Sequence, residues 1–365
     1  MTPSRRVQVH WVSSAFGLHS VARAGIVVLV FVLVRIIPGE PCTAAYGEKA
    51  TPTVCAAFAV RYGLDKPLPE QFVIYAGSLV QGDFGSSIRY GRPVAAILLE
   101  RLPVTVELTI LALLFASSVG IILGLVSATR RNSPVDAGTM VIANLGVSTP
   151  VFVLGLILAF IFAVLLKGTP FAMPPSGRLS PGVDVVPLAQ VWGLTGLTGL
   201  PRAILDFVSN MYVVNGLLTL NFGLFADALR HLILPAVAVG TIPLAIVARM
   251  TRSSLLEVLG LDYVRTARAK GLKERSVVVR HGMRNALLPV VTVIGLSLGG
   301  FLSGAVLTET IFNLTGMGKT LFESIQSRDY IVIQGVTIVV AVIYLVVNLI
   351  VDVSYAFLDP RIRLS

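Results

Sequence analysis

The chain has 365 residues, of which 55% are hydrophobic and only 13% are charged. A soluble domain carries about 25% charged residues, so this composition excludes an ordinary soluble protein and indicates one that is embedded in a membrane. The net charge is +10, but the basic residues lie between long apolar runs, which argues against a patch or tail that binds nucleic acid.

Six apolar stretches have lengths near the roughly 20 residues that a helix needs to cross a hydrocarbon core about 30 Å thick. They cover residues 16–37, 104–127, 140–166, 232–247, 287–307 and 331–355. The first is the weakest, because His19, Arg23 and Arg35 interrupt it. Prolines at positions 150, 235, 243 and 289 favour kinks in the later ones. We therefore predict an all-α integral membrane protein with six transmembrane helices.

The distribution of lysine and arginine predicts the orientation. Residues 1–15, 128–139, 248–285 and 357 onward carry about half of the 29 lysines and arginines in about a fifth of the chain. Because cytoplasmic segments carry the excess of positive charge, we expect both termini in the cytoplasm and the chain in the cytoplasmic (inner) membrane. Arg5 and Arg6 precede the first apolar run, but no small-residue cleavage site follows it, so we expect an uncleaved first helix.

This orientation divides the chain into three parts. Residues 1–37 form the cytoplasmic N-terminus and the first transmembrane helix, and residues 38–103 an extracytoplasmic segment. Residues 104–365 form a five-helix core, which contains a cytoplasmic loop at 248–285 and a second extracytoplasmic segment at 167–230. We expect short interfacial helices in this second segment, because its prolines and charges disfavour a further span.

The two cysteines, Cys42 and Cys55, both fall in the first extracytoplasmic segment. In an oxidising compartment they could pair and close a loop of about 14 residues, worth about 3 kcal/mol. Two free thiols fit the sequence equally well. Neither cysteine has metal-ligand spacing to the other or to the four histidines, so no metal site is predicted.

The loop at 248–285 is the longest predicted cytoplasmic segment between helices and holds nine basic residues against three acidic ones. Its centre reads as a short helix from Asp262, which can cap the helix start, to Gly271, which can end it. Val264 and Ala267 form a small, smooth face with that glycine, and basic side chains occupy the other faces. Such a face can dock closely in a partner's groove, whereas composition alone also fits a loop that anchors to anionic lipid headgroups.

This loop, with the sequence RHGMRNALLP at 280–289, resembles the cytoplasmic coupling loop of binding-protein-dependent ABC importer permeases, specifically the dipeptide and oligopeptide subfamily. The general family pattern has Glu-Ala-Ala ahead of a glycine. Here Arg265-Thr266-Ala267 precedes Gly271, which resembles the version found in the peptide subfamily, closest to dipeptide permeases.

The resemblance extends over nearly the whole chain through a series of short motifs in the family's order. They are IPGEP at 37–41, GDFGSS at 82–87, RPV at 92–94, RLP at 101–103, STPVF at 148–152, PPSGR at 174–178, HLILP at 231–235, ETIF at 309–312, RDY at 328–330 and DPRIR at 359–363. Two departures stand out: Thr315 replaces the family's usual proline, and Arg23 places a charge within the first span.

The resemblance implies a type I ABC importer permease fold in a subunit that performs no chemistry itself. It implies four kinds of partner: a second homologous permease, two cytoplasmic ATPases that bind ATP and magnesium, an extracytoplasmic substrate-binding protein, and membrane lipid. No cofactor is expected on this chain. The residues expected to couple to an ATPase are Asp262, Tyr263, Arg265, Thr266, Ala267, Arg268, Ala269, Lys270 and Gly271.

The resemblance makes dipeptides the best single expectation for the transported solute. Related permeases carry oligopeptides, glutathione, nickel chelates, haem or sugars, and the sequence does not identify any substrate-binding residue.

An ion-coupled secondary transporter is the alternative. Such a carrier places ionisable groups near the membrane midplane, often within internal repeats, and no convincing repeat is present. Glu107 and Asp352 do lie within predicted spans, but each is within about two turns of a helix end, so we expect their side chains to snorkel to the interface.

Residues 316–320 (GMGKT) end like a phosphate-binding loop, but the first glycine that such a loop requires is replaced by Asn313. We instead expect a turn there, in which Gly316 and Gly318 supply permissive backbone angles.

Overall fold

The computed structural model describes residues 25, 27–32, 35–36 and 40–358. Most of the predicted first span (16–37), the predicted cytoplasmic ends and the motif at 359–363 lie outside the described residues. Within the described ranges every regular element is a helix, apart from an isolated bridge between Ser86 and Pro93. The described residues divide into two compact units: those up to 103 together with 315–346 form the first, and 104–314 together with 347–358 form the second.

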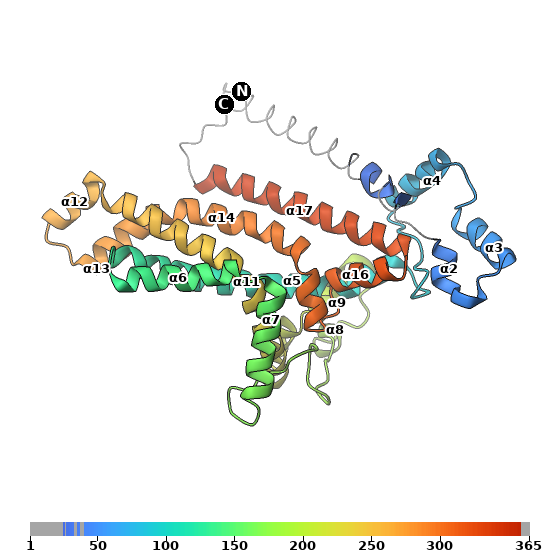
Figure 1. Ribbon diagram of the computed structural model, residues 1–365, viewed down its shortest axis with the longest axis horizontal. Coiled ribbons are helices and arrows are strands. Elements are labelled where there is room, and N and C mark those ends of the chain that lie inside the picture. The colour runs from blue at the N-terminus through green and yellow to red at the C-terminus, as the bar shows by residue number, and fades with distance from the viewer. Residues whose placement is uncertain (1–24, 26, 33–34, 37–39, 359–365) are drawn as a thin grey trace, which may run out of the picture. The chain divides into compact units, whose positions relative to one another are not determined.

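The first unit joins helices from the two ends of the chain (Figure 1). It contains α2 (Pro41–Tyr46), η1 (Gly47–Lys49), α3 (Pro52–Tyr62), α4 (Leu68–Val80), the start of α5 (Val94–Thr129), α16 (Met317–Gln326) and most of α17 (Tyr330–Leu358). Its core packs Val94 and Ile97 of α5 against Met317 of α16 and Val332 of α17. Gly335 allows this close approach, because a Cβ there would lie 2.7 Å from Cγ1 of Val94.

In the structure Cys42 and Cys55 are joined by a disulfide, with their Cα atoms 5.5 Å apart. The bond ties α2 to α3. The hydroxyl of Thr51 caps α3 by accepting a hydrogen bond from the amide of Val54, and Pro52 supplies the favoured first residue.

The second unit is built around one long helix. It contains the rest of α5, α6 (Pro134–Ser148), α7 (Val151–Ala159), the π-helix η2 (Phe160–Leu165), α8 (Leu188–Val191), α9 (Gly199–Ser209), α10 (Tyr212–Leu218), α11 (Phe222–Leu259), α12 (Asp262–Ala269), α13 (Glu274–Ser276), the π-helix η3 (Val277–Gly282), α14 (Met283–Gly304) and α15 (Val306–Ile311). The central helix α11 packs against α6, α7, α10 and α14. Figure 1 shows α11 beside α14, with α12 beyond their ends.

Glycines let α5 and α11 approach each other closely. A Cβ on Gly120 would lie 2.8 Å from the carbonyl oxygen of Leu244, and a Cβ on Gly124 would lie 2.6 Å from that of Ala248. Small residues at helix contacts are typical of membrane proteins, in which association depends on close packing. The glycines Gly120 and Gly124 therefore permit the close contact between α5 and α11, which we call the glycine seam.

Four described helices are long and apolar enough to cross a membrane: Val94–Thr129, Phe222–Leu259, Glu274–Ser297 and Tyr330–Val351. They correspond to the second, fourth, fifth and sixth predicted spans. The fourth is longer than the predicted 232–247, because helix α11 continues through charged residues at both ends. Its extension to Leu259 makes the first part of the predicted 248–285 loop helical.

The predicted third span over 140–166 is a bent pair of helices, in agreement with the kink that Pro150 favours. The helices Pro134–Ser148 and Val151–Leu165 are bent by 103° relative to each other. Pro150 has no amide hydrogen to donate and disfavours a helical conformation at Thr149, which is extended with φ −93° and ψ 122°. Counted as one span, the bent pair gives five described spans, which is compatible with six once the first is added.

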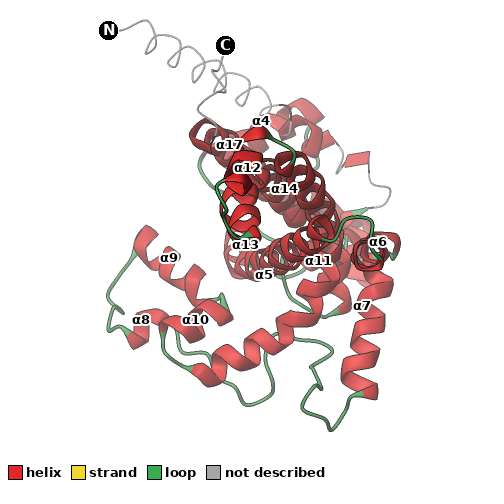
Figure 2. Ribbon diagram, turned by 90° about the vertical axis from the view of Figure 1, so that its left-hand side faces the viewer, coloured by secondary structure: helices red, strands yellow, loops and turns green. Residues whose placement is uncertain are grey.

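The predicted outer segment 167–230 does contain short helices. Figure 2 shows α8, α9 and α10 close to one another, and α11 begins at Phe222 within the same segment.

Candidate functional site

Helix α12, which contains most of the residues predicted to couple to an ATPase, follows α11 directly, after Gly260 and Leu261. The predicted helix is therefore present. Gly271 has φ +74°, a conformation that favours glycine, and turns the chain toward α13. Asp262 is the first residue of the helix, and Leu261 occupies the capping position without a side-chain hydrogen bond, so the prediction that Asp262 caps the helix is wrong.

The small face of α12 points into the protein, not outward. Val264 is fully buried and Ala267 is 7% exposed. Both pack against Val277 and against Val258 and Leu259 of α11. The expectation that this face docks in a partner's groove is therefore wrong, because the apolar run that starts at Val277 needs the same face as a cover.

The face of α12 that remains accessible carries Asp262, Arg265, Thr266 and Ala269, all of them exposed. These positions follow the spacing i, i+3, i+4 and i+7, so they share one side of the helix. Nη1 of Arg265 lies 3.4 Å from Oδ1 of Asp262, and both side chains are largely exposed, at 72% and 95%. Such a pair contributes little to stability and leaves both charges accessible to a partner.

Two side chains of α12 hold it to the segment that follows it through polar contacts. The hydroxyl of Tyr263 donates to the carbonyl oxygen of His281 at 3.2 Å and accepts a hydrogen bond from Nδ2 of Asn285 at 2.7 Å. Nη2 of Arg268 lies 2.7 Å from Oε1 of Glu274. Tyr263 and Arg268 therefore fix the helix on its own chain, while Lys270 and Gly271 are exposed beyond its end.

The buried carboxylate of Asp136, in the first turn of α6, connects α6 to α11, to α5 and to the turn between α5 and α6. Asp136 accepts two hydrogen bonds from Arg252, at 2.9 Å from Nε and 2.8 Å from Nη2. It also accepts from the hydroxyl of Ser127 and, at 2.9 Å, from the amide of Asn132. Arg252 lies about two turns before the end of α11, so this cluster braces the part of α11 that leads into α12.

Between His231 and Met250, the exposed residues of the central helix α11 lie on one stripe. In the most apolar 18-residue stretch of α11, 72% of the residues are buried. In the corresponding stretches of α5 and α17, 28% and 33% of the residues are buried. Ile242, Ile246 and Arg249 nevertheless remain exposed, at the spacing of one helix face. A hollow of about 240 Å³ lies along this stripe, lined by Val239, Ile242 and Ile246 of α11, Val151 of α7, and Ser297 and Phe301 of α14.

Arg249, on this stripe of α11, lies beside Asn144 of α6. Its Nη1 lies 3.4 Å from Oδ1 of Asn144, and both side chains are exposed. Asn144 lies four residues, or about 6 Å, beyond the start of the predicted third span at 140, and Arg249 lies in the predicted cytoplasmic segment 248–285, just beyond the predicted fourth span. No acidic side chain within the described ranges forms an ion pair with Arg249.

The expectation that Glu107 snorkels to the interface is wrong. Its side chain is 3% exposed and accepts hydrogen bonds from the amides of Val213 at 2.7 Å and Tyr212 at 3.2 Å. Nη2 of Arg178 lies 3.6 Å from Oε2 of Glu107 and forms an ion pair with this carboxylate. Glu107 thus anchors the start of α10, and with it the predicted outer segment, to α5. Asp352, the other predicted snorkelling residue, lies outside the residues whose side chains are described.

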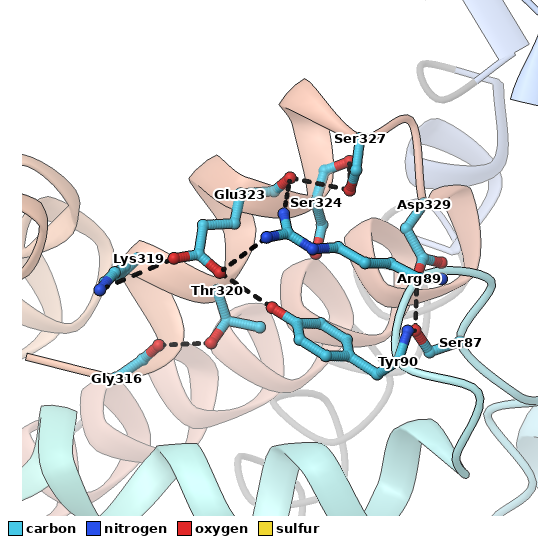
Figure 3. A network of polar contacts seen from close by, with 10 residues as sticks. All are labelled: Ser87, Arg89, Tyr90, Gly316, Lys319, Thr320, Glu323, Ser324, Ser327 and Asp329. Carbon is cyan, nitrogen blue, oxygen red and sulfur yellow. Dashed lines mark hydrogen bonds and ion pairs between the residues drawn. The ribbon is translucent and has the colours of Figure 1, made fainter. Parts of the chain in front are cut away.

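A second polar network fastens the hairpin around the bridge at Ser86 to α16 and α17 (Figure 3). Asp329 is fully buried and accepts hydrogen bonds from the Ser87 hydroxyl at 2.5 Å and the Arg89 amide at 3.0 Å. Glu323 accepts from the Tyr90 hydroxyl at 2.9 Å. Burial, together with this hydrogen bond, raises the pKa of Tyr90, so the phenol stays a neutral donor.

The phosphate-loop-like residues belong to the same network. Nζ of Lys319 lies 3.6 Å from Oε1 of Glu323, and the Thr320 hydroxyl donates to the carbonyl oxygen of Gly316. Gly316 has φ −93° and Gly318 lies inside α16, so the prediction that these glycines supply unusual backbone angles is wrong.

The second unit combines long apolar helices with the short charged helix α12 just beyond the end of α11. The chain belongs to the family described as the binding-protein-dependent transport system inner membrane component, whose family model matches residues 120–364. A second model, for the N-terminal part of the same membrane components, matches residues 19–109. These matches confirm the predicted family and the fold class that it implies.

Relatives match almost the whole chain. It is 44% identical over 340 residues to the di/tripeptide transport system permease protein DppB of Pseudomonas aeruginosa (strain UCBPP-PA14), which covers 93% of this chain and 94% of that protein. The dipeptide transport system permease protein DppB of Escherichia coli (strain K12) is 43% identical over 340 residues, with the same coverage. The probable D,D-dipeptide transport system permease protein DdpB of the same strain is 41% identical over 339 residues, covering 93% of each chain. The chain is thus a multi-pass permease subunit of a binding-protein-dependent importer.

Proposed function

We propose that this permease imports dipeptides or closely related small peptides. The support is the sequence similarity over 93% of the chain to permeases named for di/tripeptides, dipeptides and D,D-dipeptides. Their shared identity of 41–44% supports a short peptide as the solute class without distinguishing among these three.

The proposal includes the orientation and the partners of the chain. Both termini and α12 lie in the cytoplasm, in agreement with the excess of basic residues around α12. A second homologous permease completes the pathway, two ATPases bind ATP and magnesium in the cytoplasm, and an extracytoplasmic binding protein delivers the peptide.

The observation that carries the proposal is the accessible face of α12. Asp262, Arg265, Thr266 and Ala269 project from a helix whose other side is locked into the chain by Val264 and Ala267. A short helix that is both fixed on its own protein and polar on its free face is suited to receive force from a partner. Arg268, Lys270 and Gly271 lie at the edge and end of this face, and Tyr263 positions it.

The mechanism follows from the connections of α12. Closure of the ATPases on ATP displaces α12, and the displacement passes directly to α11 and, through Tyr263, to the start of α14. Because helices transmit displacement along their axes, the membrane helices switch between inward-open and outward-open states, and the nucleotide biases that equilibrium.

The test is a bulky substitution on the free face in the complete transporter. We expect Ala269→Trp to reduce the amount of ATPase that co-purifies with the permease and to abolish ATP-driven dipeptide uptake, while insertion in the membrane stays normal. Leu200→Trp is the matched control, because Leu200 is 73% exposed on α9 in the outer segment. Unchanged ATPase association and uptake in the Ala269→Trp transporter would remove α12 from the mechanism.

A further inference from the structure

We propose that the first unit binds a membrane phospholipid in two adjoining hollows, with its phosphate at Arg35, a headgroup that donates hydrogen bonds in the polar hollow, and an acyl chain in the apolar one. Three observations carry the inference: a half-buried cation that no described acidic group neutralises, polar side chains without partners beside it, and an apolar groove that begins at the same cation. The inference goes beyond peptide transport, because it concerns a ligand that stays with the subunit.

The polar hollow has a volume of about 430 Å³ and lies between α4 and the start of α17 (Figure 1). This volume is within the roughly 300–1,000 Å³ of small-molecule sites. Tyr75 of α4 and Gln334 of α17 both line the hollow. The hydroxyl of Tyr75 is buried without a hydrogen-bond partner, and Gln334 is 7% exposed with an amide that forms no hydrogen bond to another described residue. Because buried polar groups are normally paired, these two side chains indicate that the hollow receives a polar ligand.

The cation of the site is Arg35, which lines both hollows. Its Nε and Nη2 donate to Oε1 of Gln71, at 3.1 and 2.8 Å, and its Nη1 donates to the carbonyl oxygen of Phe31 at 3.1 Å. These uncharged partners hold the guanidinium in place without neutralising it, and no acidic side chain within the described residues forms an ion pair with it. The other N–H groups of its terminal nitrogens remain available, and a guanidinium matches a phosphate well.

The remaining polar groups favour a headgroup that donates hydrogen bonds. Asp83 also lines the polar hollow, and its Oδ1 accepts from the amide of Gly85 at 2.8 Å, whereas its Oδ2 has no hydrogen bond from a described residue. The amide oxygen of Gln334 is a further acceptor. A phosphoethanolamine headgroup combines a phosphate for Arg35 with an ammonium for these acceptors. The trimethylated nitrogen of phosphocholine donates no hydrogen bond and fits them less well.

The apolar hollow has a volume of about 410 Å³ and adjoins the polar one, because Arg35 and Leu68 line both. Apart from Arg35, every residue that lines it is apolar, including Val28, Val32 and Phe72. Val28 and Val32 lie in the predicted first span, and each is 46% exposed. Such a groove favours a hydrocarbon chain, because the chain removes apolar surface from water. A dipeptide has no chain to fill it, so the two hollows together favour a lipid.

The first experiment maps lipid binding on the complete transporter, purified in detergent and depleted of lipid. Phosphatidylethanolamine and phosphatidylcholine, each with a photoreactive diazirine on the same acyl chain, are cross-linked, and the yield on residues 27–32 and 68–72 is measured by mass spectrometry. The two lipids carry the same net charge, so a difference between them reports headgroup donors. We expect wild type to prefer phosphatidylethanolamine, and Arg35→Gln to weaken its binding about tenfold, the order expected for one charge-assisted contact.

The matched control is Arg61→Gln, which removes an exposed arginine of α3 in the same unit and should leave the yield unchanged. No preference between the two lipids in wild type would overturn the assignment of the headgroup. Equal binding of phosphatidylethanolamine by wild type and Arg35→Gln would overturn the site as a whole.

A second variant covers the case in which Arg35→Gln fails to fold, since Arg35 also contacts Gln71 and Phe31. Tyr75→Phe removes only the hydroxyl. We expect the cross-link yield with phosphatidylethanolamine to fall about threefold, while the unfolding temperature of the lipid-depleted transporter stays the same or rises, because a buried hydroxyl without a partner is removed. An unchanged yield, or a lower unfolding temperature without lipid, would contradict a role of this hydroxyl in binding.

Competition distinguishes a lipid from a soluble zwitterion. Glycerophosphoethanolamine, which is the same headgroup without acyl chains, and alanyl-alanine are each added in large excess before irradiation. We expect neither to lower the cross-link yield, because only an acyl chain fills the apolar hollow. Displacement by either one would show that the polar hollow takes a soluble solute, and would overturn the assignment to a phospholipid.

Discussion

The glycine seam between α5 and α11 predicts a large effect from a single methyl group. A Cβ on Gly124 would lie 2.6 Å from the carbonyl oxygen of Ala248 and 2.6 Å from Cβ of Thr251. Carbon atoms in contact are about 3.5–4.0 Å apart, so Gly124→Ala requires the two helices to separate by about 1 Å. Overpacking of this kind costs about 1–3 kcal/mol, whereas alanine in a helix interior returns only about 0.5–1 kcal/mol relative to glycine. We therefore expect a net destabilisation of about 1–2 kcal/mol.

The assay is thermal unfolding of the purified protein in mild detergent, with Gly138→Ala as the matched control. Gly138 lies in α6, and a Cβ there would meet nothing within 4 Å, so the control should keep or slightly raise the unfolding temperature. If Gly124→Ala unfolds at the same temperature as Gly138→Ala, the close seam of α5 on α11 is not a feature of the protein.

Three further predictions follow from the polar contacts and the cysteines. Asp136→Asn should lower the unfolding temperature and the number of peptides moved per ATP, because it breaks the brace on α11; the exchange Asp136→Arg with Arg252→Asp should restore part of both, and no recovery would argue against a direct pair. Glu107→Gln should make the outer segment 167–221 more sensitive to protease, because the amides of α10 lose a charged acceptor, and an unchanged cleavage rate would refute this anchor. Mass analysis after alkylation should show no modified cysteine without reductant and two with it, and two modified cysteines without reductant would contradict the disulfide.

The spans were predictable where apolar length alone decides, as it does for α5, α11, α14 and α17. Their ends were not, because a helix such as α11 continues into water beyond the apolar stretch at no cost in backbone hydrogen bonds. The bend after α6 had a visible signal in Pro150, but the size of the bend depends on the packing of α7 against α11 and α15.

The position of helix α12 could be predicted, but not which of its faces is buried. Val264 and Ala267 form an apolar face in any reading of the sequence, and that face suits a partner's groove as well as the protein's own core. The apolar residues Val277 and Val278, just ahead of the next span, were the signal that the chain would use this face itself.

The buried contacts of Glu107 and the exposure of Arg249 depend on residues distant in sequence. Glu107 meets the amides of Tyr212 and Val213, and Arg249 meets Asn144, across separations of about 105 residues. Spacing along a helix does not reveal such partners. Position near a helix end therefore suggested snorkelling for Glu107, which the fold instead uses as an anchor.

The most direct test of the transporter assignment is affinity purification of this chain from its native membrane in mild detergent, followed by mass spectrometry and an ATP-hydrolysis assay. We predict that a second six-span permease and ATPases with phosphate-binding loops co-purify, and that the complex hydrolyses ATP. A clean chain without any ATPase, in a detergent that preserves such complexes, would contradict the account and favour a stand-alone, ion-coupled carrier.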